Sequence, residues 1–182
     1  MVSRRARPKK RTESPLRLWA PWRHAYVAGH RAKSASCIFC FKRLSSKARQ
    51  RRLVLHEAAL ALVMLNRYPY NNGHLMIAPR RHVASPELLT RAERLALDDL
   101  IVHAIRQLRR LLRPTGLNLG VNLGEVAGAC IADHMHWHLV PRWLGDTNFM
   151  PVIASTRVLS QHLVESFELL APHFKEIETA LS

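Results

Sequence analysis

Short apolar runs separated by turn-forming residues dominate the middle of the chain. Residues 53–57, 60–66 and 74–79 are short and apolar, and the segment 68–73 is dense in Tyr, Pro, Asn and Gly. Runs of this length bounded by turn formers are typical of strands joined by tight connections. The pattern predicts a β-hairpin or meander over these runs, preceded by a solvated loop over the Lys-, Arg- and Ser-rich segment 41–52.

The apolar spacing then changes to a helical period. Thr90 is followed three residues later by Glu93, which is a capping-box pair, and apolar residues recur three or four positions apart as far as Leu112. Pro114 and Gly116 end the pattern, because both are typical of the residues that follow a helix. We expect one long helix that begins after Thr90.

Two further strands and a second helix complete the pattern. Residues 117–123 and 134–140 alternate as strands do, with a loop of small residues over 124–128 between them. A last helix is predicted over 158–170, and its amphipathic pattern can be followed to 181. Strands, one long helix and then strands again favour an α+β domain with an antiparallel sheet.

The net charge of +15 is placed very unevenly along the 182 residues. Residues 1–52 hold 16 Lys or Arg and one acid, Glu13, whereas residues 53–182 hold 12 basic and 12 acidic residues. The run 4–11 is basic, contains Pro and has no apolar face to bury, so we expect a disordered tail over 1–15. Such a tail either contacts nucleic acid or acidic lipid loosely, or only keeps the protein soluble.

The composition limits the class of protein further. A length of 182 residues fits one globular domain, and no apolar run approaches the ~18 residues of a membrane helix. The first fifty residues lack the apolar segment of a secretory signal, so we expect a cytoplasmic protein that has no membrane partner. Three cysteines are too few and too oddly numbered for a disulfide framework.

Candidate chemistry is concentrated in the segment His134-Met135-His136-Trp137-His138-Leu139-Val140. On a strand the three imidazoles would lie along one side, because alternate residues share a face. Burying three imidazoles in one stripe is costly unless a ligand, metal or reaction engages them. The residues alone leave two interpretations open, which are a three-histidine zinc site with a catalytic water and a histidine nucleophile that attacks phosphorus.

The same heptad resembles the signature of the histidine triad (HIT) proteins, in which histidines alternate with apolar residues. The resemblance extends to the upstream segment 65–79, which is similar to the family's nucleotide-binding hairpin, and to 118–128, which is similar to its glycine-containing loop. It covers about residues 16–155. It implies the HIT fold, with an antiparallel β-sheet, one long helix and a C-terminal helical extension over 156–182.

The flanking segments 18–23 and 141–149 resemble the bacterial branch that includes diadenosine tetraphosphate phosphorylases. The resemblance implies that His136 attacks the α-phosphate and forms a nucleotidyl-histidine intermediate, which water or inorganic phosphate then releases. It also implies that His138 contacts the phosphate oxygens and the scissile bridge, and that His74 orients the triad. Asn66 is implied to bind ribose, and Asn122 to bind phosphate or to orient the site.

Two positions before the triad depart from the family pattern. Ala129 and Cys130 stand where relatives carry Gly followed by Ser or Gln. A Cβ at Ala129 would crowd a backbone that approaches phosphate closely, and a thiol is a poorer hydrogen-bond donor than a hydroxyl. These residues are expected to border the substrate and to affect its choice, although Cys130 also fits a small buried apolar side chain.

A Cys-x-x-Cys pair precedes the strands. Cys37 and Cys40 provide two thiols, and a tetrahedral zinc site needs two further ligands. The resemblance implies that His82 and His134 supply them, which gives a structural zinc set that tethers the N-terminal segment to the sheet. No organic cofactor is expected.

These observations give three hypotheses for function. The first is a HIT-type nucleotide hydrolase or transferase that acts on dinucleoside polyphosphates, with phosphorolysis of diadenosine tetraphosphate as the favoured activity. The second is a nucleotide-binding regulator without catalysis, and the third is a basic, zinc-stabilised protein associated with nucleic acid. The resemblance also implies a homodimer.

Overall fold

The computed structural model describes residues 37–146 and 161–174. The predicted basic tail over 1–15, the segment 18–23 and the predicted domain boundary at 155 lie outside the described residues.

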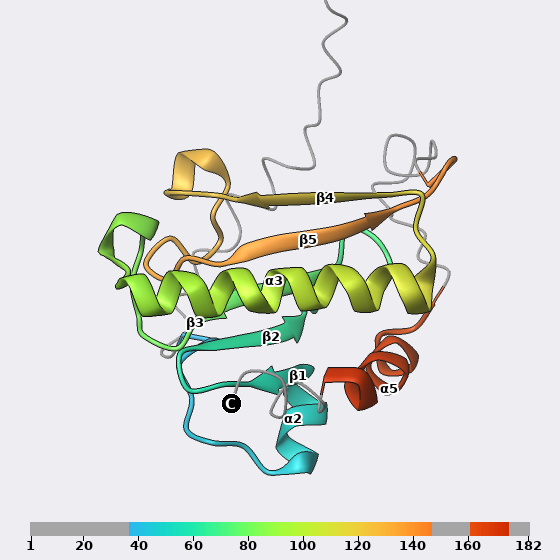
Figure 1. The fold of residues 1–182 in the computed structure, drawn as a ribbon, viewed down its shortest axis with the longest axis horizontal. Coiled ribbons are helices and arrows are strands. Elements are labelled where there is room, and N and C mark those ends of the chain that lie inside the picture. The colour runs from blue at the N-terminus through green and yellow to red at the C-terminus, as the bar shows by residue number, and fades with distance from the viewer. Residues whose placement is uncertain (1–36, 147–160, 175–182) are drawn as a thin grey trace, which may run out of the picture.

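A five-stranded sheet forms the centre of the molecule (Figure 1). Its strands lie in the order β1-β2-β3-β5-β4, and every neighbouring pair is antiparallel. They are β1 (Val54–Glu57), β2 (Ala61–Leu65), β3 (Leu75–Pro79), β4 (Gly116–Val121) and β5 (Trp137–Arg142). The predicted meander of three strands and the antiparallel α+β architecture are confirmed.

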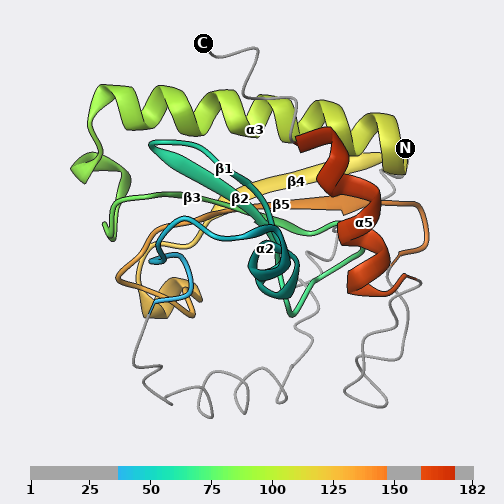
Figure 2. The same ribbon diagram turned by 90° about the horizontal axis from the view of Figure 1, so that it is seen from below.

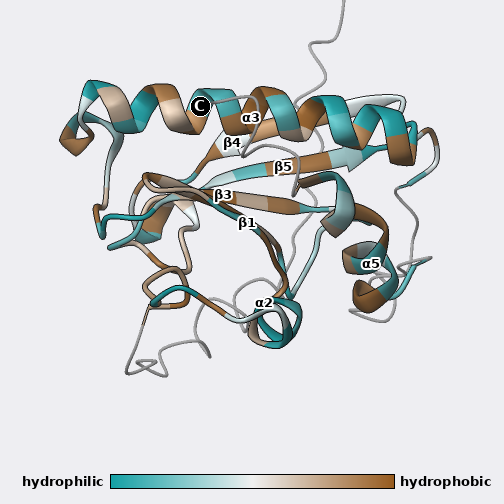
Figure 3. Ribbon diagram, turned by 60° about the horizontal axis from the view of Figure 1, so that its bottom comes forward, coloured by the Kyte–Doolittle hydropathy of each residue, from teal (hydrophilic) through white to brown (hydrophobic). Residues whose placement is uncertain are grey.

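Helix α3 (Arg91–Leu112) lies along one face of the sheet (Figure 1), and hydrophobic and hydrophilic residues alternate along it (Figure 3). Thr90 and Glu93 form the predicted capping box, since each side chain accepts the other residue's backbone N–H. The main hydrophobic core lies between this helix and the sheet, where Leu100, Ala104 and Leu108 are buried. Among the described residues, no helix is both long and apolar enough to span a bilayer.

The opposite face of the sheet is covered by irregular segments (Figure 2). Helix α2 (Ser46–Arg52), the segment 37–45 before it and the β4–β5 connection, which contains η2 (Glu125–Ala127), lie on this side. A smaller apolar cluster centres here on Phe39, whose side chain is fully buried against Leu62, Met76 and Ala78. The segment that carries the cysteines is therefore anchored to the sheet by apolar packing. A short helix, η1 (Pro86–Leu88), precedes α3.

The prediction of a loop over 41–52 was wrong for its second half. Ser45 caps α2, since its side chain accepts the N–H of Ala48, and Leu53 closes it in a left-handed conformation. Basic residues occupy the last turn, where their positive charges interact favourably with the negative end of the helix dipole. The helix has no buried residue, so its charged composition hid it from a search for apolar periodicity.

Two other element bounds also differ from the prediction. The strand expected from His134 begins only at Trp137, because the preceding residues turn away from the ladder and Met135 N–H bonds to the carbonyl of Val83 (2.7 Å). Helix α5 (Leu163–Phe174), which contacts β1 and α3, begins later than residue 158 and runs past residue 170. The structure describes residues 161 and 162 as non-helical, and residues 175–182 lie outside the described part.

Gly73 offers a test of how the hairpin between β2 and β3 packs on α3. Its φ of 70° is in the left-handed region, and a Cβ there would overlap the Leu112 side chain and press on Leu108 and Pro141, each at 3.4 Å. We expect Gly73→Ala to lower the free energy of unfolding by about 2–3 kcal/mol in urea titrations. Gly145→Ala is the matched control, because Gly145 has a similar φ of 76° and no neighbour within 4 Å. Equal losses in both variants would show that packing on α3 contributes nothing.

Candidate active site

The histidines of the heptad lie on the sheet face opposite α3. Met135 and Leu139 are buried in the main core, and Trp137 packs against that core from a partly buried position. His138 pairs with Met76 of β3 and shares its face. The predicted division of the heptad into a histidine side and an apolar side is thus confirmed, although only His138 belongs to a regular strand.

His136 is held by a backbone carbonyl. Its Nδ1 lies 3.0 Å from the carbonyl oxygen of His134, and the side chain is only 4% exposed. A carbonyl oxygen can only accept, so Nδ1 must carry the proton and donate it. In the neutral ring Nε2 is then unprotonated, which is the form of imidazole that can act as a nucleophile.

A chain of hydrogen bonds gives His138 the tautomer opposite to that of His136. The backbone N–H of Tyr70 donates to Nδ1 of His74 (3.0 Å), which makes that nitrogen an acceptor. The proton of the neutral His74 ring is therefore on Nε2, which lies 3.0 Å from Nδ1 of His138 and donates to it. His138 is left with its own proton on Nε2, so it can donate a hydrogen bond while His136 offers a lone pair.

Burial keeps these rings neutral near pH 7. Burial, with a smaller effect of the neighbouring His136 in the same direction, lowers the pKa of His138 to about 4. Burial also lowers the pKa of His136, against the opposing effect of its bond to the His134 carbonyl. The two ring centroids are 4.8 Å apart, so one unprotonated and one protonated nitrogen are available side by side.

A second cluster joins the two cysteines to His82 and His134. Sγ of Cys37 and Sγ of Cys40 lie 3.3 and 3.4 Å from Nδ1 of His134. Nδ1 of His82 lies 3.2 Å from both Cys40 Sγ and His134 Nδ1. Nε2 of His134 donates to the carbonyl of Pro79 (2.9 Å), which leaves Nδ1 without a proton and directed at the thiols.

This cluster can hold a metal ion. The four ligand atoms all lie within 4.8 Å of one another. Bonds of about 2.0–2.3 Å in a tetrahedron place ligand atoms about 3.3–3.8 Å apart, and the recorded separations of 3.2 to 3.4 Å are close to that spacing. The set of two thiols and two imidazoles fits the chemistry of zinc.

Phe39 connects the two clusters. It lies between the two cysteines in the sequence, and its ring centroid is 5.0 Å from that of His134 and 4.9 Å from that of His136. The fully buried ring therefore supports both a metal-ligand candidate and the nucleophile candidate. The sequence motif singled out only the thiols, although the position of Phe39 inside the motif was a signal for this role.

The residues predicted to contact substrate lie in two places, beside His74 and in the β4–β5 connection. Asn66 lies against His74, since its side-chain amide is 3.4 Å from Nδ1 of that ring. Asn122 is in the β4–β5 connection, where its amide donates to the carbonyl of Gly128 (3.4 Å). In the same connection Ala129 is buried and the Cys130 side chain is exposed, so the interpretation of Cys130 as a buried apolar residue was wrong. The predicted contacts of these residues with substrate stay predictions.

The comparisons with known proteins agree on one family. Residues 47–143 match the HIT domain. An AP-4-A phosphorylase of Mycobacterium tuberculosis (strain H37Rv) is 41% identical over 160 residues, which cover 85% of this chain and 82% of that protein. An adenosine 5′-monophosphoramidase of Schizosaccharomyces pombe is 29% identical over 107 residues, which cover 59% of this chain and 74% of that protein.

Solved structures share the fold at lower identity. A Zn-bound histidine triad family protein from Mycobacterium smegmatis superposes with a TM-score of 0.56 at 23% identity, covering 70% of this chain and 87% of that one. A Plasmodium falciparum diadenosine triphosphate hydrolase gives a TM-score of 0.57 at 16% identity, covering 87% and 99%. The predicted fold is confirmed.

The neutral state of the partly buried His138 ring makes stability depend on pH. Its pKa of about 4 is below the ordinary 6.5, so the unfolded chain takes up a proton between these values while the folded chain does not. The contribution of His138 to the free energy of unfolding should be constant above pH 6.5 and fall towards pH 4. One group can account for at most about 1.4 kcal/mol per pH unit, and a partly exposed ring accounts for less.

Urea titrations of the wild type and of His138→Asn between pH 7.5 and 4.5 measure this contribution. The free energy of unfolding should change less with pH in the variant than in the wild type. Subtracting the variant's values from those of the wild type removes the contributions of the other titrating groups, which both proteins share. Parallel slopes would show that His138 is not held neutral by the fold.

Proposed function

The chain belongs to the histidine triad (HIT) family, and on that premise we propose that it cleaves dinucleoside polyphosphates at the α-phosphate through a nucleotidyl intermediate on His136. The favoured activity is phosphorolysis of diadenosine tetraphosphate. One observation carries the proposal, which is that backbone groups fix opposite tautomers on two adjacent rings, an unprotonated Nε2 on His136 and a protonated Nε2 on His138.

The first half-reaction uses both rings. Nε2 of His136 attacks the α-phosphorus, so that a P–N bond forms while the P–O bond to the rest of the polyphosphate breaks. Nε2–H of His138 donates to the leaving oxygen and stabilises the charge that develops on it. With diadenosine tetraphosphate, the leaving group is ATP and the adenylyl group stays on His136. Positioning and charge stabilisation then supply most of the acceleration, as is usual in phosphoryl transfer.

The second half-reaction releases the adenylyl group. Inorganic phosphate attacks the phosphorus and gives ADP, whereas water gives AMP, and in both cases the electron pair of the broken P–N bond returns to His136. The 41% identity to the AP-4-A phosphorylase supports phosphate as the acceptor. Asn66, which lies against His74, is proposed to bind ribose, and Asn122 to bind phosphate. The comparisons do not favour the non-catalytic regulator or the nucleic-acid-associated protein.

A structural zinc ion is part of the proposal. Cys37, Cys40, His82 and His134 would hold it, and the spacing of their ligand atoms supports this. The ion would tie the cysteine segment to the sheet and fix the His134 backbone, whose carbonyl holds His136. The Zn-bound state of the Mycobacterium smegmatis relative is consistent with this assignment.

A homodimer is also proposed, through α3 and the edge of the sheet. Leu95 and Val102 lie seven residues apart on α3 and are 54% and 39% exposed, and Leu119 on the edge strand β4 is 45% exposed. These exposed apolar side chains support burial against a second copy.

The central test is turnover of diadenosine tetraphosphate with and without inorganic phosphate. The wild type should give repeated turnover to ATP and ADP only when phosphate is present. Without phosphate it should release about one ATP per chain, and the denatured protein should then carry an adenylyl group on His136 by mass spectrometry. His136→Ala should lose turnover by at least about a thousandfold, since removal of a nucleophile leaves only binding and positioning.

His103→Ala is the control for that test. His103 lies on α3, on the other side of the core from the triad, and it contacts His173 and Phe174 of α5. This variant should keep most of the wild-type turnover. Formation of AMP and ATP without phosphate would identify a hydrolase, and full activity in His136→Ala would contradict the proposed mechanism.

Zinc content gives an independent test. The purified protein should hold about one zinc per chain, and Cys40→Ser should lose most of it and unfold at a lower temperature, because binding energy contributes to folding. Cys130→Ser is the matched control, since this thiol is exposed and outside the cluster. Equal zinc content in both variants would show that the cluster does not bind the ion.

A further inference from the structure

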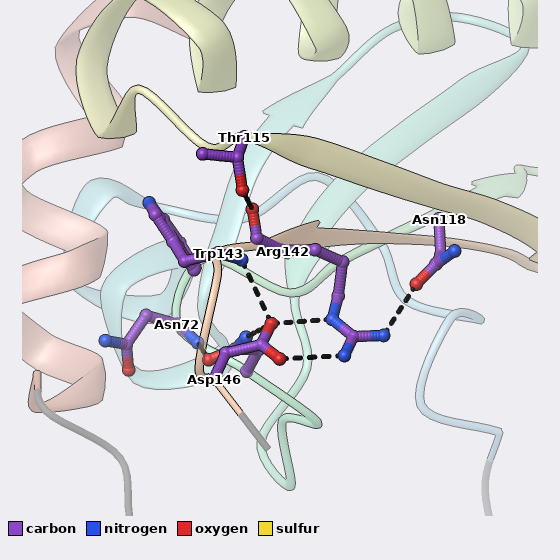
Figure 4. Close-up of polar contacts among 7 residues, drawn as sticks. Asn72, Thr115, Asn118, Arg142, Trp143 and Asp146 are labelled. Atoms are coloured by element: carbon purple, nitrogen blue, oxygen red, sulfur yellow. Dashed lines mark hydrogen bonds and ion pairs between the residues drawn. The ribbon is translucent and has the colours of Figure 1, made fainter.

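A polar cluster joins the end of β5 to the hairpin that carries His74 (Figure 4). Its centre is the Asp146 carboxylate, whose side chain is 9% exposed. The carboxylate accepts from Nε and Nη2 of Arg142 at 2.6 and 2.8 Å and from the backbone N–H of Trp143 at 3.0 Å. It also accepts from Nδ2 of Asn71 at 2.8 Å, which is the contact that reaches across to the hairpin.

Asn71 in turn shapes the hairpin loop. Its Oδ1 accepts the backbone N–H of Asn72 (3.0 Å), and its carbonyl accepts the backbone N–H of His74 (3.2 Å). With its amide bound to Asp146, the residue is held both by its own loop and by the turn after β5. The peptide N–H of Tyr70, one residue earlier, is therefore held in a defined position.

That N–H is the first donor in the chain that determines the His138 tautomer. It donates to Nδ1 of His74, and Nε2 of His74 then donates to Nδ1 of His138. If the Tyr70 N–H moves away, Nδ1 of His74 loses its short donor, and the contact to the Asn66 amide at 3.4 Å is longer. The alternative tautomer of His74, and with it that of His138, then becomes accessible.

We propose that Asp146 is a positioning residue for the reaction, and that through Asn71 it holds the Tyr70 amide that keeps a proton on Nε2 of His138. In this scheme Asp146 acts through its bond to Asn71 and not by contact with the reacting atoms. It acts on the leaving-group side of the reaction alone, because His136 takes its tautomer from the His134 carbonyl. The kinetic part of this inference rests on the proposed function, whereas the tautomer part does not.

Other bonds of the same cluster join β4 to β5, and a variant that removes one of them serves as a control. Nη1 of Arg142 donates to Oδ1 of Asn118 on β4 (3.0 Å), and the Arg142 carbonyl accepts the N–H and the hydroxyl of Thr115 at 2.9 and 3.1 Å. These bonds fasten β4 to β5 and do not involve the hairpin. Asn118→Ala therefore disturbs the cluster without cutting the path to His138, whereas Asn71→Ala cuts the path and leaves the bonds between Asp146 and Arg142 in place.

The first experiment observes the tautomers directly by ¹⁵N-edited NMR of the imidazoles in the folded, full-length protein at pH 7.5. The wild type and Asn118→Ala should show His138 with its proton on Nε2. Asp146→Asn and Asn71→Ala should show a mixture in which Nδ1 is also protonated. An unchanged His138 spectrum in both of these variants, with the fold intact, would overturn the proposal.

The second experiment measures how the rate depends on the leaving group, with adenosine 5′-phosphate esters of a series of substituted phenols. A poor leaving group needs the proton of His138 more than a good one does, so Asp146→Asn and Asn71→Ala should lose about tenfold more turnover on the poorest ester than on the best. Asn118→Ala should change all esters by one common factor.

The two experiments separate the possible failures. A common factor for all esters in Asp146→Asn and Asn71→Ala would mean that Asp146 only stabilises the fold, and would overturn the kinetic part. If the wild type turns over none of the esters and no diadenosine tetraphosphate, the proposed function fails, and the NMR spectra alone decide whether Asp146 sets the tautomer.

Discussion

Hydrogen bonds between backbone groups and imidazole rings are the constraint on which the site depends. The carbonyl of His134 fixes the proton of His136, the carbonyl of Pro79 fixes that of His134, and the amide of Tyr70 fixes those of His74 and His138. A carbonyl can only accept and an amide N–H can only donate, so each choice is forced. Neighbouring residues of one short segment thereby acquire different chemical properties.

This arrangement requires the antiparallel pairing of β3 with β5. The pairing places Met76 opposite His138 and brings the hairpin that contains His74 and Tyr70 beside the triad. The other face of the same strands is buried under α3, where Leu75, Ile77 and Leu139 form part of the main core. Packing on α3 therefore fixes the strands whose backbone then orients the histidines.

The metal-binding candidate and the nucleophile candidate are not independent sites. His134 faces the two thiols with its ring, while its backbone carbonyl accepts from His136. Phe39 packs against both rings from within the cysteine segment. A displacement of that segment would reach His136 through a packed ring and through one peptide group, so structural support and reactivity are linked by direct contact.

The sequence by itself determined the antiparallel sheet, the capped helix α3 and the division of the heptad into a histidine face and an apolar face, because these follow from local periodicity and capping. Its resemblance to the family brought together Cys37, Cys40, His82 and His134, which the structure places within reach of one ion. It missed helix α2, whose charged surface has no apolar stripe to detect. Only the tertiary structure decided which ring nitrogen of each histidine carries a proton, and it alone joined Asp146 to Asn71, 75 residues apart in the chain. Most of these contacts join segments that are far apart in the chain, and local sequence patterns do not encode where such segments meet.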